Sequence, residues 1–375
     1  MHFTLHSRMT WASLFFVQLV LALVLGGCTK QEANEVKVGV ISPLTGPAAS
    51  FGVSQKNGTE LALEDINAKG GINGKKVIAV YEDSQLDPNK ALSAFKKLVS
   101  VDKVPVVIGQ GSTTEILALA PASDQSKIIL VSPGASGAKI TGSGKYIFRL
   151  SPSDAFQGTM AANFAAKKGF KKGAIIYVNN DWGNGLKDGF EKDFKLAGNE
   201  IVSSEAIEPA SKDFKTVLVK IKTKSPDFVY IPIHPDQAGV LLKQAKELGA
   251  KLQFIGADSF SEKSILTVAG NSAEGVIFTM PAKTSGAAYD EFQRKYKAKF
   301  NSEASYIAAV AYDAMVVTAK AISESGSDAE KIKQNLQGVK GYQGVSGDIT
   351  FDKNGDVINK KFDLMTIVNG EYKLL

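Results

Sequence analysis

From residue 36 onward, the sequence alternates between short β-rich runs and stretches whose apolar residues recur at helical spacing. The β-rich runs are VKVGVI (36–41), KVIAVYED (76–83), VPVVIG (104–109), KIILVSP (127–133), GAIIYV (173–178), PDFVYIPI (226–233) and KLQFIGAD (251–258). The helical stretches are SQKNGTELALEDINAKG (54–70), PNKALSAFKKLVS (88–100), FQGTMAANFAAKKG (156–169), AGVLLKQAKELG (238–249) and YDEFQRKYKAKF (289–300). Buried strands that alternate with amphipathic helices predict βα units on parallel sheets. At roughly 100–150 residues per domain, this many units favours an α/β fold of two doubly wound lobes over one large sheet.

The alternation stops near Lys340. The residues that follow, 341–375, have the pattern of strands separated by Gly-Asp and Asn-Gly turns, without a helical stretch. We expect this tail to pair with a sheet that the rest of the chain has formed. Earlier in the chain, Gly169 and Gly249 come directly after helical stretches, which is the position of a C-terminal cap.

The N-terminus has the pattern of a secretory signal peptide. Arg8 precedes an almost wholly apolar run, residues 11–27, and LGGC places two small residues before Cys28, as in a bacterial lipobox. We therefore predict a signal peptide over residues 1–27, lipid attachment at Cys28 and a polar tether over residues 28–35. The alternative is an ordinary N-terminal membrane anchor with an incidental cysteine.

The number of cysteines and the distribution of charged residues narrow the class of protein further. Cys28 is the only cysteine, so a chain cleaved before it has no intramolecular disulfide and depends on its core for stability. Lys and Arg exceed Asp and Glu by 44 to 38, but they are spread along the chain. A nucleic-acid-binding face needs clustered positive charge, so we expect no nucleic-acid partner.

Four loops that follow predicted strands combine glycine with Ser, Thr, Asn or Asp. They are GQGSTTE (109–115), SPGASGA (132–138), VNNDWGNG (178–185) and GADSFSE (256–262). In open parallel sheets, ligands bind beyond the carboxyl ends of the strands, next to helix N-termini. The alternative reading of each loop is helix capping, because the same residue types cap helices.

Evidence for an enzyme is weak. GASGA resembles the G-x-S-x-G nucleophile motif around Ser136, but its last position is Ala138. His2 and His6 lie in the signal peptide, which leaves His234 as the one histidine for a triad. We expect His234 to be structural or to lie at the rim of a site.

Cofactor and metal motifs are also missing. The glycines of GNGLKDG (183–189) have the wrong spacing for a dinucleotide fingerprint. DKNGD (352–356) lacks the ligands of a calcium loop and is typical of a hairpin turn. No cluster has the spacing of a zinc site. We expect a binding protein without cofactor or metal.

A family resemblance rests on several blocks in order: VGVISPLTGPAASFG, GTELALEDINAKGGINGKKV, YEDSQLDPNKA, VIGQGSTTE, VSPGAS, FRLSPSDAFQG, VNNDWGNGL, AEGVIFTMP and AYDAM. They resemble the type I periplasmic binding proteins, and within them the leucine/isoleucine/valine-binding proteins of ABC importers. The resemblance implies two Rossmann-like lobes joined by three crossings, with the ligand enclosed between them. It places residues 36–150 and 279–345 in the first lobe, and 151–278 and 346–375 in the second.

The resemblance also implies which residues hold the head group of the ligand. Thr113 matches a hydroxyl that holds an amino-acid carboxylate. Gly134, Ala135 and Ser136 match a stretch that grips carboxylate and ammonium together. Asp258 matches the acid that pairs with the α-ammonium, although the branched-chain binders most often use Glu there. Helix N-termini attract anions and a carboxylate attracts an ammonium, so these residues are suited to the two charged groups of an amino acid.

Three aromatic residues match the walls of the side-chain pocket in this family: Phe51, Trp182 and Tyr306. Two differences weaken the match. The chain lacks a cysteine pair that bridges two loops in some members, and Ile233 lies near a position that is aromatic in the branched-chain binders. Urea, short amides or aromatic acids, which other members of this fold bind, are therefore alternative ligands.

By this resemblance, the protein is expected to be a monomeric receptor on the outer side of a bacterial membrane, held there by the lipid that LGGC predicts at Cys28. It would capture an amino acid, with branched-chain residues favoured, and deliver it to ABC permease subunits. A ligand-sensing module for a signalling partner is a second class. A hydrolase built on Ser136 and His234 is a third, and it would turn its ligand over instead of releasing it unchanged.

Overall fold

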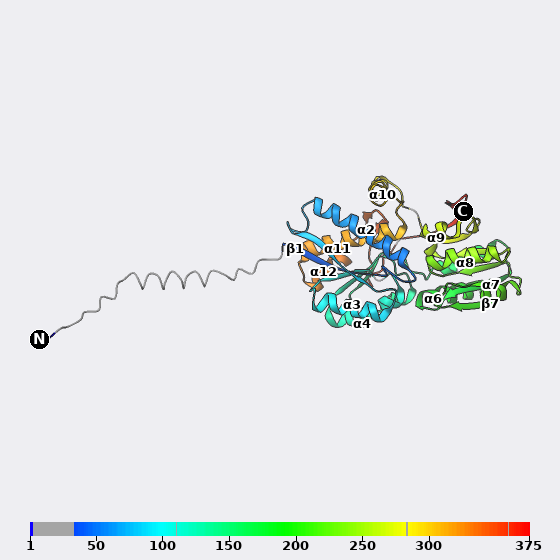
Figure 1. Ribbon diagram of the computed structural model, residues 1–375, viewed down its shortest axis with the longest axis horizontal. Coiled ribbons are helices and arrows are strands. Elements are labelled where there is room, and N and C mark those ends of the chain that lie inside the picture. Colours follow the sequence, from blue (N-terminus) through cyan, green and yellow to red (C-terminus); the bar gives the residue numbers. More distant parts are fainter. Residues whose placement is uncertain (3–33, 110, 283, 359) are drawn as a thin grey trace.

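The computed structural model describes residues 1–2, 34–109, 111–282, 284–358 and 360–375. Cys28, the predicted signal peptide from residue 3 and most of the predicted tether lie outside these ranges. The described chain forms two α/β lobes that lie side by side (Figure 1). The prediction of a two-lobed α/β fold is confirmed.

The first lobe is built on a five-stranded parallel sheet in the order β2-β1-β3-β4-β5. Its strands are β1 (Glu35–Ser42), β2 (Lys76–Asp83), β3 (Val106–Gly109), β4 (Ile129–Ser132) and β5 (Ile147–Arg149). Successive strand residues point to opposite faces, so each face has its own core. Its helices are α2 (Ala49–Ala68), α3 (Pro88–Ser100), α4 (Thr113–Ser126), α10 (Ala287–Phe300), α11 (Tyr306–Ser325) and α12 (Ala329–Gln337).

Two helical layers cover that sheet. Val38 and Val40 pack with α2, α11 and α12, whereas Ile41 and Val107 pack with α3 and α4 on the other face. Within the described part of the chain, α11 is the one helix long and apolar enough to cross a membrane. It is 72% buried over that window, so it is the central helix of a core.

The second lobe contains a seven-stranded sheet in the order β14-β13-β10-β9-β8-β6-β7. Its strands are β6 (Lys172–Val178), β7 (Glu200–Ile207), β8 (Phe228–Ile231), β9 (Gln253–Gly256), β10 (Ile277–Pro281), β13 (Phe362–Val368) and β14 (Glu371–Leu374). Its helices are α5 (Gln157–Lys167), α6 (Asp181–Leu196), α7 (Lys215–Lys222), α8 (Pro235–Glu247) and α9 (Ser264–Ala269). The 3₁₀ turn η2 (Asp258–Ser261) follows β9. Helices α5 and α6 pack on one face, and α7, α8 and α9 pack on the other.

The C-terminal tail behaves as its sequence predicts. Strand β13 pairs antiparallel with β10 of the second sheet, and β14 pairs antiparallel with β13. Before them, β11 (Tyr342–Gly344) and β12 (Gly347–Ile349) form a separate two-stranded hairpin. The predicted caps Gly169 and Gly249 both have positive φ, at 85° and 58°.

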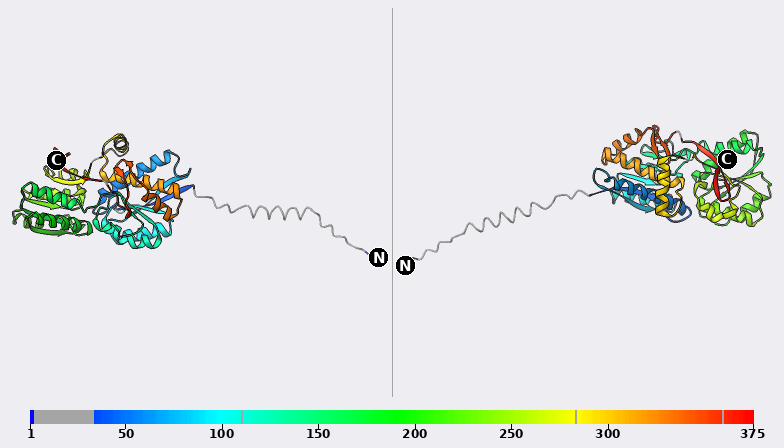
Figure 2. Two further views of the ribbon diagram at one scale, coloured as in Figure 1. Left: turned by 180° about the vertical axis from the view of Figure 1, so that it is seen from behind. Right: turned by 90° about the horizontal axis from the view of Figure 1, so that it is seen from above.

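The chain passes between the lobes three times: between β5 and α5, between β10 and α10, and between Val357 and β13. Figure 2 shows the two lobes from behind and from above. Two of the boundaries differ from those expected. Residues 279–281 belong to β10 of the second sheet, and residues 347–357 belong to the first lobe, where Ile349 and Phe351 are fully buried.

Candidate functional site

A cavity lies between the lobes, where the four glycine-containing loops meet. About 600 Å³ of space there, including open solvent at its mouth, holds no atoms. Seven of the predicted ligand residues line it: Phe51, Thr113, Gly134, Ser136, Trp182, Asp258 and Tyr306. Ala135 does not, since its side chain is buried in the core beside α3 and α4 and its N–H donates to Ser132 Oγ at 3.1 Å.

The wall from the first lobe is the N-terminus of α4 together with the loop after β4. Ser112 is the N-cap of α4, and Thr113 is the first helical residue. The first N–H groups of a helix have no intrahelical partner and carry about half a positive charge in sum. Thr113 Oγ1 accepts a hydrogen bond of 3.0 Å from the Gly137 N–H, which fixes the loop against the helix. This wall is suited to hold a carboxylate.

Phe51 on α2 closes that wall from the side. Its ring lies so near the backbone that a Cβ at Gly111 or Gly134 would come within 2.1 or 2.4 Å of it. Both positions therefore require glycine while Phe51 keeps this place. The ring thus forms an apolar side of the cavity directly beside the carboxylate-binding wall.

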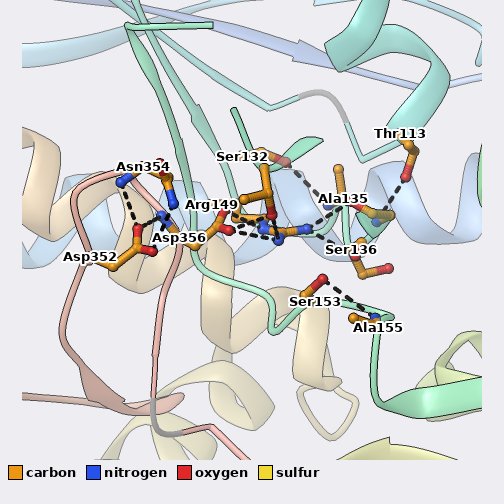
Figure 3. A network of polar contacts seen from close by, with 12 residues as sticks. Thr113, Ser132, Ala135, Ser136, Arg149, Ser153, Ala155, Asp352, Asn354 and Asp356 are labelled. Atoms are coloured by element: carbon orange, nitrogen blue, oxygen red, sulfur yellow. Dashed lines mark hydrogen bonds and ion pairs between the residues drawn. The ribbon is translucent and has the colours of Figure 1, made fainter. Parts of the chain in front are cut away.

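The loop after β4 is held from behind by Arg149, which is 1% exposed. Its Nη1 donates to the carbonyl oxygens of Ser136 and Gly137 at 2.9 Å each. Its Nε and Nη2 form a two-pronged ion pair with Asp356 at 2.7 and 3.0 Å (Figure 3). Asp356 comes from the turn 352–356, where its own N–H donates to Asp352 Oδ1. The turn at 352–356 was predicted, but its contact with this loop and the role of Arg149 were not.

The opposite wall is acidic. Asp258, the first residue of η2, lines the cavity, and its buried Oδ1 has no hydrogen-bond partner among the described residues. Burial raises the pKa of Asp258 to about 6. An ammonium placed next to Asp258 would supply the missing donor and lower that pKa again.

A second acid, Asp154, stands behind Ser136 and was not predicted. Ser136 Oγ donates to Asp154 Oδ2 at 3.0 Å, and the Asp154 N–H donates to the Ser136 carbonyl at 2.8 Å. Burial and then the charge of Asp258 raise the pKa of Asp154 well above its usual value. Because the Ser136 proton is directed at Asp154, the hydroxyl can offer a lone pair to a cation in the cavity. Ser136, Asp154 and Asp258 together form a place for a positive group.

His234 also lines the cavity, stacked on Trp182 with ring centroids 5.6 Å apart and planes 13° apart. It is the N-cap residue of α8, and its Nε2 lies 3.2 Å from Asn180 Nδ2. Burial lowers the pKa of His234 to about 4, so the ring is neutral at pH 7. Ile233, its neighbour, lies in the core of the second lobe. At this loop, the aromatic ring in the cavity wall is therefore that of His234 and not a side chain at position 233.

The hydrolase alternative gains no support from this geometry. Ser136 Oγ donates to Asp154, and His234 Nε2 faces Asn180, so these two side chains are engaged elsewhere. The segment GNGLKDG lies within α6 and is not a phosphate-binding loop. In the described part of the chain, no three His, Cys, Asp or Glu side chains are grouped to hold a metal ion.

Hydrogen bonds join the two lobes around the cavity. Ser50 Oγ and Ser54 Oγ, one turn apart on α2, donate to Asp236 Oδ1 at 2.6 Å and Glu262 Oε2 at 2.8 Å in the second lobe. The Asp181 N–H donates to Thr114 Oγ1 at 3.2 Å on another side. The lobes are therefore closed over the cavity in this structure.

Fold and site define a two-lobed ligand-binding protein whose cavity is completed by both lobes. The sequence model of the periplasmic binding protein family matches residues 35–371. The chain belongs to this family, in its leucine/isoleucine/valine-binding branch. Family members are substrate-binding proteins for transport and not enzymes.

Individual relatives agree with this assignment. The chain is 30% identical over 338 residues to the leucine-, isoleucine-, valine-, threonine- and alanine-binding protein of Pseudomonas aeruginosa, covering 88% of this chain and 89% of that protein. A branched-chain amino-acid transporter substrate-binding protein from Streptococcus pneumoniae, solved with isoleucine, superposes with a TM-score of 0.84 at 29% identity over 90% of this chain and 98% of that one. A solute-binding protein from Rhodopseudomonas palustris, solved with 3,4-dihydroxybenzoic acid, gives 0.82 at 27% identity over 91% and 96%.

Proposed function

We propose that this protein captures an α-amino acid of branched-chain size outside the bacterial cytoplasm and delivers it to the permease of an ABC importer. The observation that carries the proposal is the opposition of two charged walls across one cavity. The N-terminus of α4 and the loop 134–137 suit a carboxylate, and Asp258, with Ser136 and Asp154 beside it, suits an ammonium. An α-amino acid carries these two groups on one carbon.

The remaining walls support an apolar side chain. Phe51, Trp182 and Tyr306 line the cavity, and aromatic walls bury aliphatic groups with little loss of their own freedom. A ligand that touches both lobes has its full set of contacts only when the lobes are closed. Its binding energy would therefore shift the protein toward the closed form that a permease could recognise.

Thermal unfolding of residues 29–375, refolded to remove carried ligand, tests this function. We expect leucine, isoleucine or valine to stabilise the protein by about 2.7 kcal/mol at 100 times its dissociation constant. Benzoates, urea and short amides form the comparison set, because a ligand without an ammonium leaves Asp258 unpaired. Stabilisation by that set alone would contradict the amino-acid assignment while leaving the fold untouched.

Anchoring through Cys28 is part of the proposal and has its own test. The sequence LGGC before a polar segment supports lipid attachment at that thiol. We expect Cys28→Ser to accumulate as precursor without lipid, detectable by labelled fatty acid and by mass. Mutation of the neighbouring Thr29 to Ser is the control and should be processed normally. Lipid incorporation into Cys28→Ser would contradict the anchor.

A further inference from the structure

Glu262 is a second acid in the cavity wall, distinct from the acids of the ammonium site. It follows η2 directly, lines the cavity and is 3% exposed. Glu262 is the last residue of the loop GADSFSE, and no role was predicted for it. Its position in the wall and its carboxyl oxygen Oε1 indicate which kind of group the side chain of the ligand carries.

Only one of its carboxyl oxygens is engaged. Oε2 accepts the hydrogen bond from Ser54 Oγ on α2, whereas the buried Oε1 has no hydrogen-bond partner in the part of the chain that the structure describes. Burial, the largest effect, raises the pKa of Glu262 to about 7, although the nearby hydroxyls of Ser305 and Ser54 lower it. A buried acceptor without a donor is unfavourable, and the cost is greater when the group is charged.

Glu262 and Asp258 have different surroundings. Glu262 Oε2 accepts a hydrogen bond from Ser54 on α2 and the charge of Asp236 acts on Glu262, whereas the charge of Asp258 acts on Asp154. With the α-ammonium assigned to Asp258, Oε1 of Glu262 is available to a second donor group of the ligand. In addition, no lysine or arginine lines the cavity within the described residues, so no cationic side chain there competes with a donor group of the ligand for Glu262.

We propose that the cavity prefers an amino acid whose side chain carries a hydroxyl or amide hydrogen-bond donor, which Glu262 Oε1 accepts. This inference rests on the proposed function and narrows its ligand class. A purely aliphatic side chain of the same size would fill the aromatic walls but leave Oε1 unpaired. Sites built to hydrogen-bond a ligand group discriminate strongly against analogues that lack the group.

Matched pairs of ligands provide the test. Threonine and valine have nearly the same shape, and so do asparagine and leucine, so each pair isolates the donor at one chain length. Isothermal titration calorimetry would measure all four on the wild type and on Glu262→Gln, Glu262→Met and the control Glu247→Met, whose side chain is 49% exposed on α8. We expect the wild type and the control to bind the polar member of at least one pair roughly tenfold more tightly or better.

The variants separate the role of Glu262 from general damage. Glu262→Met should reverse the preference within that pair, and Glu262→Gln, which keeps an acceptor oxygen, should retain part of it. If Glu262→Met does not fold, judged by its unfolding transition, the wild-type ratios and Glu262→Gln decide. Preference of the wild type for valine and leucine, or unchanged ratios in Glu262→Met, would overturn this inference and leave amino-acid binding standing. Failure of the wild type to bind any of the four would overturn the proposed function as well.

Discussion

Replacing Asp258 with alanine is expected to weaken amino-acid binding by about 2–5 kcal/mol, the usual cost of truncating one partner of a buried charged pair. The reason is geometric and electrostatic. Asp258 lines the cavity with a buried Oδ1 that has no hydrogen-bond partner among the residues that the structure describes, and it stands opposite the helix N-terminus that suits the carboxylate. Without it, the α-ammonium would be desolvated against Ser136 and Asp154 alone.

The test of Asp258→Ala needs a control ligand that lacks the α-ammonium. The 2-oxo acid of the preferred amino acid keeps the carboxylate and the side chain, so Asp258→Ala should change its affinity far less. Calorimetry on both ligands gives the ratio, and Asp188→Ala, with a side chain 68% exposed on α6, serves as the matched control. Equal losses for the amino acid and the oxo acid would remove Asp258 from the ammonium site.

Much of the fold could be predicted because the strands and helices of βα units have different apolar periods. Strands such as β3 and β8 are buried along their whole length and stood out as apolar runs. Strand β7 was missed because it is an edge strand with a mostly half-exposed pattern, EIVSSEAI, that lacks a continuous apolar run. The observed lobe boundaries differ from the predicted ones for a related reason. The lobe to which β10 and the segment 347–357 belong depends on the strands and core they pack against, which local sequence does not show.

The residues of the candidate site also fall into those that could be predicted from the sequence and those that could not. Residues in loops after strands, such as Thr113, Ser136 and Asp258, could be predicted because the fold brings those loops together. Asp154 and Glu262 could not, since their importance lies in burial and in an unpartnered oxygen, which depend on the packing of both lobes. The available signal was an acid in the loop GADSFSE for Glu262 and an acid in the block FRLSPSDAFQG for Asp154.

The role of Arg149 could not be predicted from the sequence either. Its substitution is the second change from which we expect a large effect. This arginine is 1% exposed, and its guanidinium joins two carbonyl groups of the loop 134–137 to Asp356. It also donates to Thr141 Oγ1 at 2.9 Å. An arginine at the end of the short strand β5 gives no sequence signal of this role, because the partner acid lies more than two hundred residues away.

Arg149→Met should lower the free energy of unfolding by about 3–5 kcal/mol, because it removes the cationic partner of Asp356 and takes one hydrogen bond from each of two buried carbonyl groups. Urea titration followed by tryptophan fluorescence measures this change. The control is Arg294→Met, which removes an exposed arginine paired with Glu291 on the surface of α10 and should change stability little. The same variant should bind its amino acid more weakly even when folded, since the loop 134–137 would lose the guanidinium that bonds the carbonyl groups of Ser136 and Gly137. A stability equal to that of Arg294→Met, with unchanged affinity, would show that the loop keeps its shape without the arginine.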